Sequence, residues 1–213
     1  MALTGFGLFA FVVVHMVGNL QFFLGREAIN RYAYFLHSVP ELLWGARIGL
    51  LVMVGLHVWT AIQLSAENRA ARPIGYKRKK ALGSSYASRT MLMSGLIIGC
   101  FVIYHLLHFT VQVPEVNFTG KDFHDLVDAE KHHDVYQMMV TGFLQPWVTL
   151  FYIVGVGLLC LHLSHGVSSL FQSLGLRTGK YTPLLKSFGF WMSWVLVIGY
   201  WSIPISVVLG LKK

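Results

Sequence analysis

Five long apolar stretches dominate this sequence: roughly 3–24, 42–65, 90–113, 146–171 and 187–210. Four contain no Asp, Glu, Lys or Arg, and the second contains only Arg47, close to one end. A helix needs about 20 mostly apolar residues to cross the hydrocarbon core of a bilayer. With 55% hydrophobic and 12% charged residues, the chain also has too little polar surface for a soluble domain. The sequence therefore predicts an all-α integral membrane protein, with five transmembrane helices bundled in a single membrane domain over residues 1–213.

The connecting segments differ in charge, and this difference predicts their sides. Segment 66–89 has seven Lys and Arg against one Glu, and segment 172–186 has three against no acid. Segment 114–145 has six Asp and Glu against two Lys, and segment 25–41 is balanced. Because positive loops stay cytoplasmic, the N-terminus is predicted inside and the C-terminus outside. The net charge of +8 is therefore a topology signal rather than a nucleic-acid-binding surface.

Histidines occur at unusual depth in these stretches. Six of the ten lie inside them: His15, His57, His105, His108, His162 and His165. Ionisable residues within a membrane are costly and mark ligand sites, proton relays or transport pathways. A single one is equally well explained as a neutral imidazole hydrogen-bonded to a neighbouring helix. Four of the five stretches carry at least one, which favours a functional role.

The depths of the histidines sort them into two levels. From the rise per residue, His57 lies about 13 Å and His165 about 9 Å from the inner ends of their helices. His15 lies about 13 Å and His105 about 12 Å from the outer ends of theirs. The pattern predicts an inner pair, His57 with His165, and an outer pair, His15 with His105. Residues three apart share a helix face, so spacing alone leaves His108 and His162 open as alternatives.

Two imidazoles at each level favour haem over zinc. Zinc takes three or four protein ligands in one cluster. Haem takes two axial ligands from opposite sides, and helix bundles supply them from facing helices. With both axial positions filled, such haems transfer electrons and leave no place for oxygen.

Several motifs resemble one family over nearly the whole chain. They are LTGFGLFAFVVVHMVGN at 3–19, ENRAARPIGY at 67–76, SGLIIGCFVIYHLLHF at 94–109 and LSHGVSSLFQSLG at 163–175. The run YAYFLHSVPELLWGARIGLLVMVGLHVWTAIQL at 32–64 fits the same pattern. These motifs resemble the cytochrome b membrane-anchor subunit of succinate dehydrogenases and fumarate reductases, of the five-helix, two-haem type.

The resemblance implies cofactors and partners. By local motif, the axial histidines of the two haem b groups fall on His15, His57, His105 and His165, so the motifs choose His105 over His108 and His165 over His162. The subunit would belong to an oxidoreductase of the respiratory chain and tricarboxylic acid cycle, in the cytoplasmic membrane of a prokaryote. A flavoprotein subunit would interconvert succinate and fumarate, an iron–sulfur subunit would relay the electrons, and a quinone, commonly menaquinone, would exchange them. The dicarboxylate site would not lie on this subunit.

Position suggests candidates for two further roles. Cations and hydroxyls near the membrane faces could hold haem propionates: Ser88, Arg89 and Arg177 at the inner haem, and Arg31 and Arg47 at the outer one. His37, Glu41 and His108 are candidates for a quinone site at the outer end, which needs proton donors beside an electron donor. Segment 114–145, with His124, His132 and His133, is predicted to be a solvated loop rather than a metal site. Leu163 stands where some fumarate reductases of this type carry a proton-conducting glutamate, which puts that route in doubt.

Two other interpretations remain open. The chain could be the haem b anchor of another respiratory complex, such as a hydrogenase or formate dehydrogenase. It could also be a transporter whose histidines relay protons. Transporters often have paired repeats, and five helices do not divide into two halves.

Overall fold

The computed structural model describes residues 1–71, 90–176 and 179–212, and nearly all of them are helical. The helices are α1 (Ala2–Leu20), α2 (Arg26–Ser38), α3 (Pro40–Ala70), α5 (Met91–His105), α6 (Pro114–Asn117), α7 (Val135–Phe143), α8 (Pro146–Ser173) and α9 (Thr182–Val208). Short turns follow α1 (η1, Gln21–Leu24), α5 (η2, the π-helical turn Leu106–Thr110) and α6 (η3, Phe123–Asp125). In these described ranges the only extended pairing is an isolated bridge between Val127 and His133.

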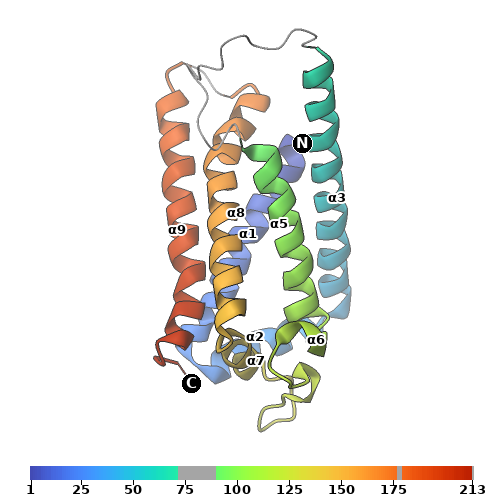
Figure 1. Cartoon of the computed structure of the whole chain (residues 1–213), viewed down its shortest axis with the longest axis vertical. Coiled ribbons are helices and arrows are strands. Elements are labelled where there is room, and N and C mark those ends of the chain that lie inside the picture. The colour runs from blue at the N-terminus through green and yellow to red at the C-terminus, as the bar shows by residue number, and fades with distance from the viewer. Residues whose placement is uncertain (72–89, 177–178, 213) are drawn as a thin grey trace.

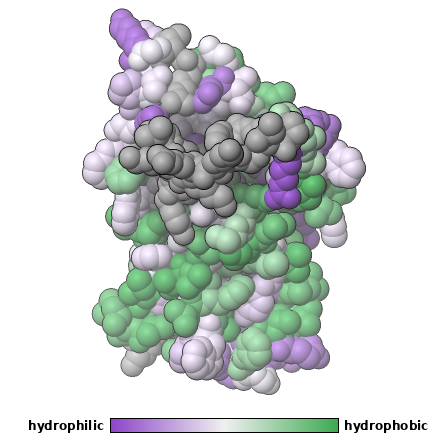
Figure 2. Space-filling view, turned by 45° about the horizontal axis from the view of Figure 1, so that its top comes forward, coloured by the Kyte–Doolittle hydropathy of each residue, from purple (hydrophilic) through white to green (hydrophobic). Residues whose placement is uncertain are grey.

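Five of the described helices are long and apolar enough to cross a membrane, as the sequence predicts. They are Ala2–Leu24, Pro40–Ala70, Met91–Thr110, Pro146–Ser173 and Thr182–Val208. Apolar side chains form a broad band between more polar ends (Figure 2). This is the architecture of a multi-pass membrane protein, because such a band would be unstable in water.

Prolines and glycines mark where the helices begin and end. Pro40 and Pro146 are the first residues of α3 and α8, where the missing N–H costs no hydrogen bond. Gly25 adopts a φ of 110°, which ends η1 and lets α2 begin in a new direction. These breaks separate the membrane-length helices from the short elements that connect them.

The helices pack unevenly. Helix α8 packs against α1, α5 and α9, most extensively against α9, and α1 also contacts α9 and α3. Helix α3 lies at the edge of the bundle, and none of its residues is fully buried (Figure 1). The two termini lie toward opposite ends, and α2, α6 and α7 gather at the end nearest the C-terminus (Figure 1). We call α2 together with residues 111–145 the cap.

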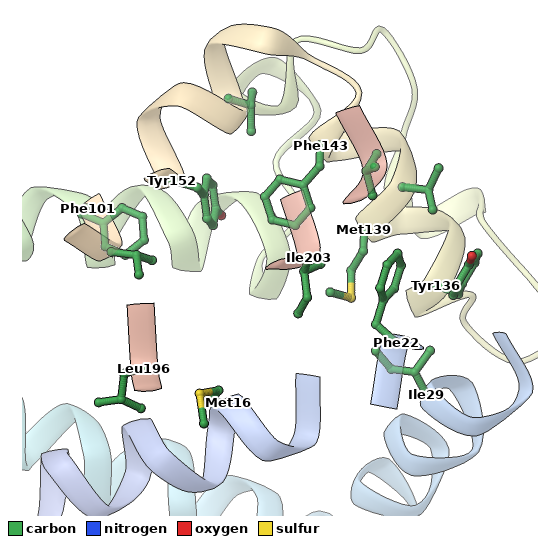
Figure 3. Packing of buried hydrophobic residues seen from close by; sticks show 14 of the residues in the cluster. Met16, Phe22, Ile29, Phe101, Tyr136, Met139, Phe143, Tyr152, Leu196 and Ile203 are labelled. Atoms are coloured by element: carbon green, nitrogen blue, oxygen red, sulfur yellow. The ribbon is translucent and has the colours of Figure 1, made fainter. Parts of the chain in front are cut away.

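An aromatic core joins the bundle to the cap. Phe101 of α5 meets Tyr152 of α8 edge-to-face at 5.3 Å, and Tyr152 meets Phe143 of α7 at 5.1 Å. Figure 3 shows this series continuing through Met139 to Phe22 and Tyr136, whose rings stack at 4.8 Å. Aromatic pairs in these orientations contribute beyond their buried area, so the core is best packed at the cap end.

The cap corrects one prediction. Segment 114–145 is not a solvated loop, because it folds into α6, η3 and α7 and fully buries Phe123 and Asn117. Asp134, only 1% exposed, accepts a hydrogen bond from Asn30 at 2.9 Å and pairs with Arg26, which ties α7 to α2. The balanced charges of segment 25–41 did not indicate that its helix α2 binds segment 114–145 through Arg26 and Asn30.

Candidate functional site

The outer pair comes together in the middle of the bundle. The rings of His15 on α1 and His105 on α5 have their centroids 5.9 Å apart, at an interplanar angle of 76°. Phe11 stacks on His15 at 5.2 Å, and Tyr200 of α9 lies 6.2 Å from it. Phe101 stacks near His105 at 6.2 Å. Aromatic packing from three helices therefore surrounds the two imidazoles, which contact each other edge to face.

This separation fits two axial ligands of one metal. A metal lies about 2 Å from an imidazole nitrogen, so two rings on opposite sides of it have centroids about 6 Å apart. The contacts of His108 differ from those of His105: it is fully buried among Tyr104, Phe109 and Phe123. No described ring contact joins it to His15. The geometry favours His105, the histidine that the motif selects.

His105 is the last residue of α5, and His108 lies within the π-helical turn that follows it. The N–H of Val111 donates to the carbonyl of Leu106 at 2.7 Å, which closes a wider turn than an α-helix allows. Single π turns within α-helices are frequent at functional sites. Both imidazoles nevertheless approach one hydroxyl, that of Tyr152, with Nδ1 distances of 3.3 Å for His105 and 3.0 Å for His108.

The inner pair is less complete. His57 on α3 faces the start of α1, where its Nδ1 lies 3.2 Å from the Thr4 hydroxyl. His165 on α8 has its Nε2 3.0 Å from the hydroxyl of Ser169 in the same helix. Between them lies His162, close enough to interact electrostatically with both and 3.2 Å from the Ser94 hydroxyl. The structure thus brings three histidines to one level without a face-to-face pair.

Small residues surround this inner cluster. A Cβ at Gly5 would lie 3.3 Å from His57, a tight approach that the ring could accept only by shifting. Gly55 and Gly166 each lie within two residues of a predicted ligand, and a Cβ there would meet no atom within 4 Å. Gly55 is exposed on α3, so the open space beside it lies on the outer surface of the bundle. Among the described residues, no three His, Cys, Asp or Glu side chains are arranged to hold a metal ion by themselves.

A cavity of about 490 Å³ lies between the cap and the ends of α3 and η2. Four histidines and one arginine contribute most of its polar lining: His37, His124, His132, His133 and Arg47. Tyr34, Thr110 and Gln112 line it as well. A volume of this size is typical of small-molecule sites. Thr110 and Gln112 belong to the π-helical turn after His105 and to the residues that follow it, so the cavity lies at the end of the helix that carries His105.

Gln112 is the most constrained residue of the cavity. It adopts a left-handed φ of 61°, which is uncommon for a residue other than glycine. It is 9% exposed, its Nε2 lies 3.0 Å from His133 Nε2, and its Oε1 is buried without a protein partner. A buried acceptor of this kind calls for a donor from a ligand or water.

The histidines of the cavity differ in their surroundings. Burial lowers the pKa of His133, and the nearby His124 and His37 lower it further, against raising contributions from the Leu126 backbone and Asp134. His133 is therefore neutral at pH 7 and able to accept a proton. The Nδ1 of His124 lies 2.9 Å from Asp122, whose pKa is lowered by hydrogen bonds from the His124 backbone and side chain.

The structure places some of the residues predicted for the haem propionates and the quinone at the cavity and others away from it. His37 and Arg47 line the cavity, whereas Glu41 and His108 are not among its lining residues. Arg31 is largely exposed on α2, 4.0 Å from Glu27. Ser88, Arg89 and Arg177 lie outside the described residues.

Sequence reasoning missed Tyr152, Gln112 and Thr4, and it assigned His133 to a solvated loop. An aromatic or hydroxyl residue inside an apolar run looks like ordinary core, so no local signal distinguishes Tyr152 or Thr4. Gln112 did carry a signal, because it is a polar amide near the end of the apolar stretch 90–113 and precedes Pro114 by two residues.

No protein-family model matches the chain, and no curated protein or solved structure matches it either. The case for a function therefore depends on the sequence motifs and on the geometry of the histidines and the cavity.

Proposed function

We propose that the chain is the di-haem cytochrome b membrane anchor of a succinate:quinone oxidoreductase, acting as a succinate dehydrogenase or a quinol:fumarate reductase. The observation that carries this proposal is the contact between His15 and His105, whose ring centroids lie 5.9 Å apart inside an apolar bundle. Such an arrangement is costly in a membrane unless a ligand uses it. The assignment to succinate and fumarate chemistry rests on the family motifs around all four histidines.

The chain's own residues would hold two haem b groups. Haem supplies a one-electron redox centre, and two centres at two depths let electrons cross the bilayer. His15 and His105 are the proposed ligands of the outer haem, and His57 and His165 those of the inner haem. At the inner haem, Ser88, Arg89 and Arg177 remain candidates for the propionates, as does Arg31 at the outer one. Arg47 lines the cavity, so we assign it to the quinone instead.

The cavity beside the outer pair is the proposed quinone site. Quinol oxidation yields a quinone, two protons and two electrons, so the site needs proton acceptors close to an electron acceptor. His133, kept neutral by burial, and His37 can take the protons. Arg47 can donate a hydrogen bond to a quinone oxygen, and the unpartnered Oε1 of Gln112 can accept one from a quinol hydroxyl. Menaquinone is the quinone that the resemblance implies.

The remaining assignments concern partners and membrane. The basic segment 66–89 would face the cytoplasm and dock an iron–sulfur subunit, which receives or supplies electrons from a flavoprotein subunit. The N-terminus would then lie inside and the C-terminus outside, in the cytoplasmic membrane of a prokaryote.

A spectrum tests the proposal. The purified chain should show a reduced-minus-oxidised spectrum of low-spin b-type haem, with two haems per chain, and should co-purify with a flavoprotein and an iron–sulfur protein. A colourless preparation would refute the cytochrome assignment and favour a proton-relaying transporter. Coloured protein with a different soluble partner would leave the cytochrome and refute the succinate assignment.

Kinetics with a menaquinol analogue test the cavity. Arg47→Gln should raise the KM for the quinol about tenfold, which corresponds to the loss of one charge-assisted hydrogen bond. Lys121→Gln is the matched control, because it removes a cation from the same cap at a residue that does not line the cavity. Equal kinetics in both variants would place the quinone elsewhere.

A further inference from the structure

One buried hydroxyl lies between two imidazoles of the outer site. The Tyr152 hydroxyl is 3.3 Å from His105 Nδ1 and 3.0 Å from His108 Nδ1. All three side chains lie in the aromatic core, with Tyr152 almost fully buried and His108 completely buried. No other described hydrogen bond reaches either ring, so Tyr152 alone orients both imidazoles.

Counting protons determines the direction of these bonds. A phenol has one hydrogen, so Tyr152 can donate to one Nδ1 and must accept from the other. Nδ1 of His105 is engaged by Tyr152, which leaves Nε2 as the nitrogen that can coordinate the haem iron. Coordination through Nε2 requires its lone pair, so the proton of His105 must be on Nδ1. His105 therefore donates to Tyr152, and Tyr152 donates to His108.

The surroundings of His108 suit its role as the final acceptor. With Nδ1 accepting, its proton is on Nε2, which is buried and has no partner. A Cβ at residue 142 would lie 3.1 Å from this nitrogen, so Gly142 lets α7 pack closely against the ring. The Phe109 ring holds the other side at a centroid distance of 4.0 Å. His108 is thus fixed in place with one nitrogen pointing at Tyr152.

We propose that Tyr152 and His108 are positioning residues of the outer haem, which hold His105 in its ligating tautomer and lower the reduction potential of that haem. This inference rests on the proposed function. A hydrogen bond from Nδ1–H makes an imidazole a more basic ligand, and a more basic ligand stabilises the oxidised iron. Donation from Tyr152 to His108 polarises the hydroxyl and strengthens its acceptance from His105.

Redox titration of Tyr152→Phe tests the proposal. The variant keeps the ring and removes the hydroxyl. The equilibrium constant for reduction of the outer haem should therefore rise about five- to tenfold, and a tenfold rise corresponds to an increase of about 59 mV in its reduction potential. The inner haem should titrate as in the wild type. The component that disappears in His57→Ala identifies the inner haem.

Tyr104→Phe is the matched control. The Tyr104 ring also packs against His108 and Tyr152, at 5.5 and 6.0 Å, but its hydroxyl donates to the carbonyl of Val116. Its loss should leave both potentials unchanged. Two haems at wild-type potentials in Tyr152→Phe, or an equal shift in Tyr104→Phe, would overturn the inference.

Variants of His108 decide the matter if Tyr152→Phe does not accumulate. His108→Phe removes the acceptor of the Tyr152 hydroxyl and should shift the outer haem in the same direction by a smaller factor. His108→Gln retains an acceptor and should restore most of the wild-type potential. Identical potentials in these two variants, or loss of a haem in both, would refute a positioning role. A wild-type chain without haem would instead refute the proposed function.

Discussion

The outer and inner histidine pairs are surrounded by different kinds of side chain. The outer pair is packed by Phe11, Phe101 and Tyr200, and its two rings already contact each other edge to face at 5.9 Å. The inner histidines lie beside the small hydroxyls of Thr4 and Ser169, and His57 lies on α3, a helix without a fully buried residue. Packing of the protein alone can therefore preorganise the outer site. We expect the inner site to take its final geometry from the group it binds.

The largest effect should come from removing one ligand of either pair. His15→Ala or His105→Ala should eliminate the outer haem and halve the b-type absorbance, because a single axial histidine does not retain it. His57→Ala or His165→Ala should eliminate the inner haem alone. Haem content per chain and the redox titration distinguish these outcomes. Retention of both haems in any of the four variants would refute the predicted pairing of the axial histidines.

A substitution at Gly155 should weaken the outer site selectively. A Cβ there would lie 2.4 Å from the Phe101 ring, so Gly155→Ala should force α5 away from α8 and destabilise the fold by about 1–3 kcal/mol. The outer haem should be lost more readily than the inner one in thermal unfolding followed by absorbance. Gly45→Ala is the control, because no atom lies within 4 Å of the new methyl group. Equal losses of both haems would show that the outer site is not the one that packing supports.

The Arg26 pair with Asp134 should matter only at the cap. Arg26→Ala should destabilise the cap by about 1–2 kcal/mol, a modest effect because Arg26 is half-exposed and Asn30 still binds the carboxylate. Hydrogen exchange of α7 measures this, and exchange near the inner pair serves as the reference. Unchanged exchange in α7 would contradict a stabilising role for the ion pair.

The same carboxylate gives the cap a pH dependence. Burial alone would raise the pKa of Asp134, but hydrogen bonds from Asn30, the Gln137 backbone and Arg26 together lower it below its ordinary value of 3.8. A lowered folded-state pKa stabilises the cap above pH 3.8, and this contribution is lost as the pH falls through the folded value. Asp134→Asn should remove this acid transition in the exchange of α7. A transition of the same size in the variant would assign it to another group.

The smallest effect should come from His162. If His165 is the inner ligand, His162→Phe removes only the hydrogen bond to Ser94 and both haems remain. If the inner site uses His162 instead, the same variant loses a haem and His165→Phe does not. Haem content of these two variants therefore resolves the three-histidine cluster that spacing left open.

The membrane-length helices were predictable because apolar length is a property of local sequence. Their ends differ from the expected ranges by only a few residues, and the rings of His15 and His105, which were expected at one depth, contact each other. The cap was not predictable in the same way. Its helices are stabilised by contacts between distant residues, such as Asn30 with Asp134, and its charges looked like those of a solvated loop.

The candidate site also combines residues that local sequence predicts with residues whose role depends on tertiary contacts. Histidines inside apolar runs are conspicuous, so the four proposed ligands could be named from the sequence alone. Tyr152 could not, because its role comes from a hydroxyl position set by α5 and α7 together. The cavity could not be predicted either, since it is lined by α2, α3, η2 and the cap, which meet only in the folded chain.

The π-helical turn at Leu106–Thr110 has a consequence for how such a protein can change. A π turn contains one residue more than the α-helical turn it replaces. Deleting that extra residue would restore an α-helical turn and leave the segments on both sides close to their present orientation. Side chains within the turn, His108 among them, would shift, while His105 would stay beside His15. Natural insertions and deletions in this turn can therefore change the contact between His108 and Tyr152 without disturbing the histidine pair beside it.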